Sequence, residues 1–355
     1  NGNNDTYAKS LVDDKGKELL NSTYKEEKWA KAAAACKDVM ELGVYDLYHA
    51  SFNTTEAVGD PKTIVPADST CIFAQNTWPK GWKNIDPFKS YRVLFSGDIA
   101  PEDNTELIFS RIDQNATEIN HSMKSFARHS MPRDFGGWNT HGLTQKMVDA
   151  YYMNDGSDCP GKDRELNGGN GTERLTGFTT LQDYRQGKYK PLSANVSLQY
   201  ANREPRFYAS VGYNGSVWEY LGDPEPTHHN RQTFYYRGSG NGYNNSQFYL
   251  RTGISVKKYV NQTDVPDRED YRNIKDKAEP AIRYADILLL YAEALNELEG
   301  TYSIASWDKN TTYTIQRNIE EIQKGIHPIR IRGGVPDYDA QIYSNKNLLR
   351  DKIKR

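Results

Sequence analysis

The sequence is short of cysteine, of excess basic charge and of long apolar runs, and each shortage excludes a class of protein. Its three cysteines, Cys36, Cys71 and Cys159, form neither a disulfide framework nor a metal-binding spacing. Lys plus Arg number 45 against 47 Asp plus Glu, so the chain lacks the basic excess of a general nucleic-acid binder. No run of 18 apolar residues occurs, so the sequence offers no candidate for a membrane-spanning helix.

Aromatic residues, by contrast, are abundant. The chain holds 25 Tyr, 11 Phe and 6 Trp, although hydrophobic residues make up only 37% of its 355 residues. A polar chain with so many amphipathic rings predicts long polar loops. Rings of this kind suit both protein interfaces and sugar surfaces.

Residues 280–300 predict the most apolar helix of the chain. Pro280 suits the first helical turn and Gly300 suits the position just past the helix end. Apolar residues occupy most of the circumference, which indicates a helix buried between other helices. The polar exceptions predict a salt-bridge ladder on the helix surface rather than catalytic carboxylates. These exceptions are Arg283, Asp286, Glu293 and Glu297.

Further elements follow from periodicity and turn signals. Residues 25–42 predict a helix that ends at Gly43, with a buried stripe of Trp29, Ala33, Cys36 and Met40. A helix at 144–152 takes Thr144 as its cap. The remaining expectations are strands at 106–112, 206–213 and 216–220, a hairpin turn at Asn214-Gly215, an extended piece at 251–259, and helices at 313–323 and 338–354.

Several of these segments, in this order, resemble the SusD/RagB family of outer-membrane nutrient-binding lipoproteins. Residues 280–297 are similar to the signature helix of that family. Residues 204–215 resemble its Asp-Pro-Arg-Phe-Tyr-Ala segment, with Glu204 in place of the usual Asp. Residues 144–156 resemble its Met-Val-Asp-Ala-Tyr segment, with Leu143 replacing the usual Pro. Residues 104–110 and 29–48 also fit.

The resemblance implies a mainly α fold. Tetratricopeptide-like helix pairs would form a scaffold, and a loop-rich region would carry short β-hairpins. We expect one SusD-like domain over residues 1–355, with 25–50 and 280–355 as helical scaffold and 51–279 as the ligand-binding region. The lipid-bearing cysteine, the first helices and the segment after Arg355 that the family carries do not occur here, so we expect a chain truncated at both ends.

The resemblance also implies a function without catalysis and without a cofactor. Members bind oligosaccharides or polysaccharides on the cell-surface side of the outer membrane, where an N-terminal lipid, absent from this chain, anchors them. They deliver the glycan to a SusC-like TonB-dependent transporter. A peptide- or protein-binding helical-repeat scaffold is the alternative. A glycoside hydrolase is less favoured, because no stretch marks the two carboxylates that such an enzyme needs.

The family's ligand residues lie in variable loops, so the site has to be argued from chemistry. Sugars present apolar faces, which stack on flat rings, and polar rims, which take hydrogen bonds. The ligand-binding candidates are therefore rings in polar or Gly-rich loops. Trp78 and Trp82 share one loop, Trp138 follows two glycines, and Tyr213 and Trp218 flank the expected hairpin turn.

Other residues give weaker signals. Asn154-Asp-Gly-Ser-Asp158 has spaced oxygen ligands that could hold Ca²⁺, although the loop lacks a closing Glu. His228 and His229 are adjacent, and in an extended segment their side chains would point in opposite directions. Trp29 and Trp307 are interpreted as packing residues.

Overall fold

In a computed structural model, the chain divides into two compact units. Unit 1 comprises residues 1–46, 283–327 and 338–355, and unit 2 comprises residues 47–282 and 328–337. The structure describes residues 5–20, 23–52, 65, 67–112, 122–164, 168–169, 172–244, 249–266, 271 and 273–354. The sequence-based division placed 47–50, 280–282 and 328–337 in the scaffold, whereas the structure assigns these residues to unit 2.

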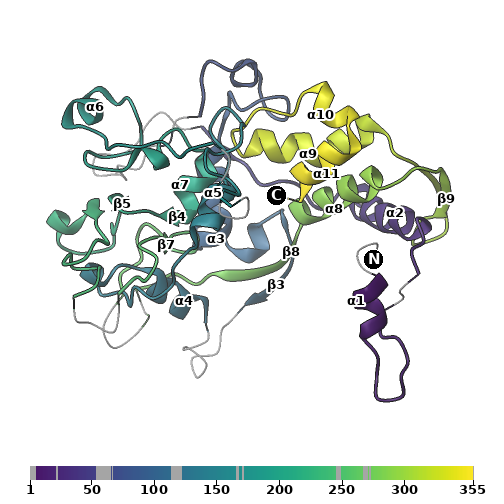
Figure 1. The fold of residues 1–355 in the computed structure, drawn as a ribbon, viewed down its shortest axis with the longest axis horizontal. Helices are drawn as coiled ribbons and strands as arrows, with labels where there is room; N and C mark the ends of the chain where they lie inside the picture. The colour runs from purple at the N-terminus through teal and green to yellow at the C-terminus, as the bar shows by residue number, and fades with distance from the viewer. Residues whose placement is uncertain are drawn as a thin grey trace. The chain divides into compact units, whose positions relative to one another are not determined.

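Unit 1 contains most of the long helices. Its elements are α1 (Asp5–Ser10), α2 (Glu27–Glu41), α8 (Tyr284–Asn296), β9 (Tyr302–Ala305), β10 (Thr312–Ile315), α9 (Ile319–Arg332, whose last residues belong to unit 2), α10 (Ala340–Ser344) and α11 (Lys346–Ile353). Helices α2 and α8 lie side by side (Figure 1). Ala30, Ala33 and Ala34 are buried on α2, and such small side chains let the two helices approach closely.

Helix α9 also approaches α8 closely, at a glycine. A Cβ atom built on Gly325 would lie 2.4 Å from the carbonyl oxygen of Leu288 and 3.0 Å from the Cβ of Ala292. Only a residue without a side chain fits there. The core of unit 1 is otherwise apolar, with Tyr291, Leu295 and Ile322 nearly inaccessible to solvent.

Two predictions for this part of the chain are wrong in detail. Pro280 lies in strand β8 (Ala278–Arg283), and helix α8 begins only at Tyr284, because β8 pairs with strand β3 (Leu107–Ile112). Helix α8 then ends at Asn296, before Gly300. The helix expected at 313–323 begins only at Ile319, since Tyr313 and Ile315 alternate inward along strand β10.

Trp307 is not a packing residue. It lies between β9 and β10, and 72% of its surface is exposed. Trp29, by contrast, packs against the core of unit 1 as expected.

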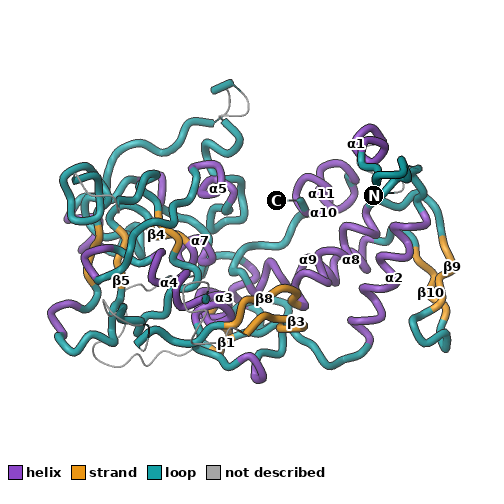
Figure 2. Tube along the Cα trace, turned by 90° about the horizontal axis from the view of Figure 1, so that it is seen from below, coloured by secondary structure: helices purple, strands orange, loops and turns teal. Residues whose placement is uncertain are grey.

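Unit 2 consists largely of loops between short elements, as the predominance of teal tube in Figure 2 shows. Besides β3 and β8, its elements are β1 (Ala50–Ser51), β2 (Ile85–Asp86), α3 (Pro87–Ser96), α4 (Met123–Ser130), α5 (Gln145–Ala150), α6 (Leu181–Gln186), α7 (Pro205–Ser210), β4 (Val211–Gly212), β5 (Ser216–Trp218), β6 (Arg231–Thr233) and β7 (Ser255–Val256). Short 3₁₀ turns occur at Ile72–Gln75, Pro101–Asp103, Arg133–Phe135, Leu198–Tyr200 and Pro226–His228. The strands form two-stranded pairs β1–β2, β3–β8, β4–β7 and β5–β6.

The hairpin expected around Asn214-Gly215 does not form. Residues 205–210 are helix α7, because Pro205 occupies its first turn, and β4 pairs with β7 rather than with β5. Strand β5 pairs instead with β6. The turn itself is present, and Gly215 has a φ of +88°.

Four other predictions are confirmed. Helix α2 and strand β3 form where periodicity placed them. Thr144 caps α5, and its hydroxyl accepts a hydrogen bond of 3.3 Å from the backbone N–H of Met147. The fold is mainly α. Among the described residues, no helix has the length and apolar character needed to cross a membrane.

Candidate functional site

Unit 2 contains a cleft of about 450 Å³ in which aromatic and polar side chains converge. It is lined by Arg133, Asp134, Phe135, Gly136, Tyr220, Asp223, His228, Arg231, Val265, Pro266 and Asn273. Clefts with a few aromatic rings and several fixed polar groups are the usual form of small-ligand sites.

The half-buried ring of Tyr220 supplies the aromatic part of the cleft, and it packs against Phe135, which is only 4% exposed. Their ring centroids lie 4.8 Å apart with 40° between the planes. Phe135 ends a 3₁₀ turn that closes at Gly136, whose φ is +81°. A Cβ on Gly136 would lie 2.9 Å from the carbonyl oxygen of Pro266, so glycine is required at this close approach.

The hydroxyl of Tyr220 stays protonated at neutral pH. It donates a hydrogen bond of 3.2 Å to the carbonyl oxygen of Phe135. Burial, together with the nearby carboxylate of Asp223, raises the pKa of Tyr220 to about 12. The ring is therefore a neutral amphipathic surface with a fixed orientation.

Charged side chains surround the two rings. The guanidinium of Arg231 lies over the Phe135 ring, with Cζ 5.4 Å from the centroid. The Asp223 carboxylate lies 3.2 Å from Nδ1 of His228 and accepts the backbone N–H of Glu225 at 2.8 Å. The rim thus offers both donors and acceptors to a ligand.

The other side of the rim is fixed by the loop that follows β6. Arg133 donates through Nη2 to the carbonyl oxygen of Gly240. Asp134 accepts a 2.8 Å hydrogen bond from Nδ2 of Asn241, and its own N–H donates to Oδ1 of Asn241 at 3.1 Å. These hydrogen bonds fix the positions of Arg133 and Asp134 on the rim of the cleft.

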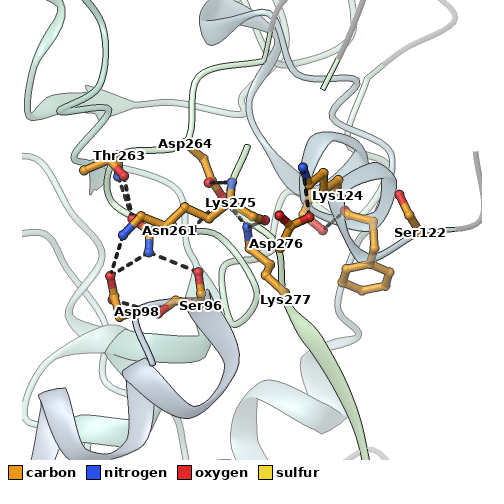
Figure 3. Close-up of polar contacts among 12 residues, drawn as sticks. Ser96, Asp98, Ser122, Lys124, Asn261, Thr263, Asp264, Lys275, Asp276 and Lys277 are labelled. Carbon is orange, nitrogen blue, oxygen red and sulfur yellow. Dashed lines mark hydrogen bonds and ion pairs between the residues drawn. The ribbon is translucent and has the colours of Figure 1, made fainter. Parts of the chain in front are cut away.

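A network of polar side chains, drawn in Figure 3, adjoins in sequence the cleft wall formed by Val265, Pro266 and Asn273. Within this wall the backbone N–H of Val265 donates to the carbonyl oxygen of Asn273 at 3.0 Å. Next to it, Lys277 and Asp264 form an ion pair of 2.9 Å whose two side chains are fully inaccessible to solvent. Burial raises the pKa of Asp264 and lowers that of Lys277.

Asn261 extends this network to the end of helix α3. Its Nδ2 donates to the carbonyl oxygen of Ser96 at 3.0 Å and to Oδ1 of Asp98 at 2.7 Å. Lys275 also pairs with Asp98, at 3.1 Å. The Lys277–Asp264 pair and Asn261 are buried, so this part of the network positions the cleft wall rather than offering a binding surface.

None of the five rings singled out from the sequence lines this cleft. Trp82, Tyr213 and Trp218 are 4%, 4% and 2% exposed and lie in apolar clusters of unit 2. The structure gives these three a packing role, because a ring inside the core presents no face to a sugar. A ligand-binding role for them stays a prediction that would require the rings to leave the core.

Trp78 and Trp138 are half-buried. Trp78 stacks on His49 with centroids 5.0 Å apart and packs against the cluster that contains Trp82. Trp138 contacts His129 edge-on at 4.3 Å and carries the guanidinium of Arg128 over its ring. Their partial exposure is compatible with a ligand contact, which stays a prediction.

Sequence reasoning missed the cleft by a few positions. It selected Trp138 and Trp218, because tryptophan offers the largest ring, whereas Phe135 and Tyr220 line the site. Trp218 and Phe135 belong to one buried cluster. The available signal was the Phe135-Gly-Gly segment, whose glycines permit the turn that places Phe135.

The two weaker sequence signals have local explanations. Pro226–His228 form a 3₁₀ turn rather than an extended segment, so His228 and His229 both bond to Asp223, and the expectation of opposite directions is wrong. Asp155 bonds to Ser157. No group of three or more His, Cys, Asp or Glu that could hold a metal occurs in the described part of the chain, and calcium binding stays a prediction.

The molecule is thus a mainly α protein with a polar, ring-lined cleft in its loop-rich unit. A sequence model of the SusD family matches residues 105–355, which is more than half of the chain. The protein belongs to the SusD family. No match was found among curated protein sequences.

Solved structures show the same fold. A SusD-like protein from Bacteroides fragilis NCTC 9343 matches with a TM-score of 0.53 at 19% identity, covering 93% of this chain and 47% of that one. BT4246 matches in two structures, with a TM-score of 0.58 at 16% identity and 0.60 at 17% identity. Both cover 96% of this chain, and 52% and 50% of BT4246. The chain therefore spans about half the length of these structures.

Proposed function

We propose that this protein binds oligosaccharides or polysaccharides without cleaving them and passes them to a SusC-like TonB-dependent transporter. It would act on the cell-surface side of the outer membrane, held there by an N-terminal lipid. Membership of the SusD family supports this role. The observation that carries it is the cleft, in which the half-buried ring of Tyr220, packed against buried Phe135, meets the polar rim of Asp223, His228 and Arg231.

The rim is suited to binding rather than to hydrolysis. A glycosidase needs one carboxylic acid to donate a proton and a second carboxylate to act across the glycosidic bond. In this cleft the two carboxylates, Asp134 and Asp223, are held by Asn241 and His228. The Tyr220 ring and the hydrogen-bonded polar groups around it can supply stacking and specificity for a sugar.

Binding of a single oligosaccharide is expected to be weak. Millimolar affinity corresponds to about −4 kcal/mol, which a stacked ring and a few hydrogen bonds can supply. Weak binding also suits a receptor that must release its ligand to a transporter.

The test is calorimetry and affinity electrophoresis of the purified chain against a panel of polysaccharides. Tyr220→Ala is expected to weaken binding of a retained glycan about tenfold, since the variant removes the half-buried ring that the cleft offers to a sugar face. Trp307→Ala removes an exposed ring from unit 1 and serves as the matched control. Equal retention of Tyr220→Ala and wild type would place the site elsewhere.

Two further measurements separate the rival functions. Release of reducing ends from a bound glycan by the pure protein would establish a hydrolase. If the protein binds no glycan of the panel but co-purifies with a transporter, a peptide ligand would be favoured instead.

A further inference from the structure

A row of arginine and tyrosine side chains lies beside the cleft in unit 2. Arg237 lies over the ring of Tyr243 at 5.8 Å, and Arg251 lies over the ring of Tyr249 at 5.3 Å. The two tyrosine rings meet edge to face with centroids 5.0 Å apart. We call these four residues the arginine–tyrosine ladder. Both arginines are exposed, and Tyr243 is 43% exposed, so the ladder faces solvent.

The ladder lies in a part of the sequence without acidic residues. No Asp or Glu occurs between Glu225 and Asp264. Two of the cations in this interval are used inside the protein. Lys257 pairs with buried Glu219 at 2.9 Å, and Lys258 lies 3.9 Å from the centroid of the Phe95 ring.

The arginines of the interval remain without a carboxylate partner among the described residues; they are Arg231, Arg237 and Arg251. Some other cations of unit 2 pair with acids, as in Arg174–Asp149 and Lys188–Asp183. The guanidiniums of the ladder lie 5.8 and 5.3 Å from the ring centroids of Tyr243 and Tyr249. A guanidinium without a carboxylate partner can bind an incoming anion in a bidentate manner.

The ladder and the cleft are joined by one loop. Gly240 and Asn241 bond to Arg133 and Asp134 of the cleft rim. The same loop continues to Tyr243, whose carbonyl oxygen accepts the N–H of Gly238 at 3.1 Å. A polymeric ligand that occupies the cleft therefore has the ladder as its next surface along this loop.

We propose that the arginine–tyrosine ladder is a second contact surface, for the carboxylate or sulfate groups of an anionic glycan. It rests on the proposed glycan-binding function and specifies the ligand class. The anionic groups pair with Arg237 and Arg251, and sugar faces contact the exposed parts of the tyrosine rings. The cleft alone would bind neutral and anionic chains alike, whereas the ladder selects the anionic ones.

The test uses probes that differ only in charge. Dextran and dextran sulfate form one pair, and methyl-esterified and free polygalacturonate form the other. Wild type is expected to retain at least one anionic member roughly tenfold better than its neutral partner at low salt, with the advantage lost at high salt. Preference for dextran sulfate identifies sulfate as the recognised group, and preference for free polygalacturonate identifies carboxylate.

Variants then locate the preference. Arg237→Gln and Arg251→Gln are each expected to weaken anionic binding about fivefold, and the double variant to abolish the preference. Neutral binding should not change. Arg185→Gln makes the same charge change at another exposed site of unit 2 and should behave as wild type. Arg237→Lys keeps the charge but loses the stacked planar fork, so it should restore binding only in part.

Several outcomes would overturn the proposal. Equal retention of charged and neutral partners would refute the ladder while leaving glycan binding intact. An unchanged preference in the double variant would place the anionic site elsewhere. Single-stranded DNA held as tightly as the anionic glycans would show polyanion adhesion without sugar recognition. Failure to bind any glycan, charged or neutral, would remove the proposed function itself.

Discussion

The two units of this protein are stabilised by different interactions. Unit 1 is organised by apolar side chains that recur on helices α2, α8 and α9, with Leu295 and Ile322 at its centre. Unit 2 contains ion pairs in its interior, and both side chains are at most 3% exposed in Lys277–Asp264 and in Arg332–Glu106. An ion pair of unit 1, Glu297–Arg350, is 14% and 29% exposed.

The difference follows from how each unit provides hydrogen-bond partners for its backbone N–H and C=O groups. Helices bond their own N–H and C=O groups, so their side chains are free to be apolar. Loops leave backbone groups without partners, and buried polar side chains must supply them. Asp264 accepts the backbone N–H groups of Asn261 and Lys275 at 2.8 and 2.9 Å, while Lys277 donates to the carbonyl oxygen of Lys275 at 2.8 Å.

The largest effect is expected from breaking the buried pair. Lys277→Met leaves the Asp264 carboxylate buried without its partner, and such single removals cost about 3–5 kcal/mol. We expect this loss in the free energy of unfolding, measured by urea denaturation. The substitution should also weaken glycan retention, because the network supports the cleft wall that Val265, Pro266 and Asn273 form.

Two companion variants test the cause. Lys31→Met in unit 1 removes one partner of an exposed pair, Glu27–Lys31, and should change stability by less than about 0.5 kcal/mol. Asp264→Leu combined with Lys277→Met removes both charges and should recover part of the loss. Equal effects of the two single Lys→Met variants would show that the buried pair has no special role.

The same contrast explains what the sequence could predict. Periodicity located α2, and apolar content located α8, because helices of unit 1 depend on patterns a few residues long. The boundary at Tyr284 could not be predicted, since strand β8 forms only by pairing with β3, far away in sequence. The strand expected at 206–213 was wrong for a local reason, because Pro205 occupies the first turn of helix α7.

The candidate site was the least predictable part. Phe135 and Tyr220 meet because segments 85 residues apart in sequence are folded together, and nothing local marks that contact. Ring size favoured Trp82 and Trp218, yet both of these tryptophans fill the core of unit 2. In a loop-rich unit with little aliphatic core, aromatic residues are needed for packing first.

A middle-sized effect is expected from the packing of unit 1. Gly325→Ala places a Cβ 2.4 Å from the carbonyl oxygen of Leu288, so α8 and α9 must move apart. Overpacking of this kind costs about 1–3 kcal/mol. Gly300→Ala is the control, because its Cβ would meet only side-chain atoms, at 3.3 Å or more. Thermal unfolding of both variants measures the two losses of stability. A larger loss for Gly325→Ala than for Gly300→Ala would show that the close contact between α8 and α9, rather than the replacement of glycine in general, causes it.

The smallest effect is a pH dependence located in unit 2. Burial opposes ionisation of Asp98, but Arg92 and hydrogen bonds from Asn261 and Ser96 outweigh it and hold the pKa below the usual 3.8. A lowered pKa means that the folded state binds fewer protons than the unfolded state. The stability contributed by Asp98 is therefore complete above about pH 4 and lost as the pH falls further.

Asp98→Asn should consequently have a lower free energy of unfolding than wild type at pH 7. This difference, here called the stability gap, should become smaller as the pH falls below about 4. Glu297→Gln makes the matching change in unit 1, where Arg350 outweighs burial and lowers the pKa of Glu297 below 4.5. Urea denaturation at a series of pH values measures both gaps. A gap for Asp98→Asn that stays constant between pH 7 and pH 3 would mean that the carboxylate charge contributes nothing. The network of unit 2 would then depend on hydrogen bonds alone.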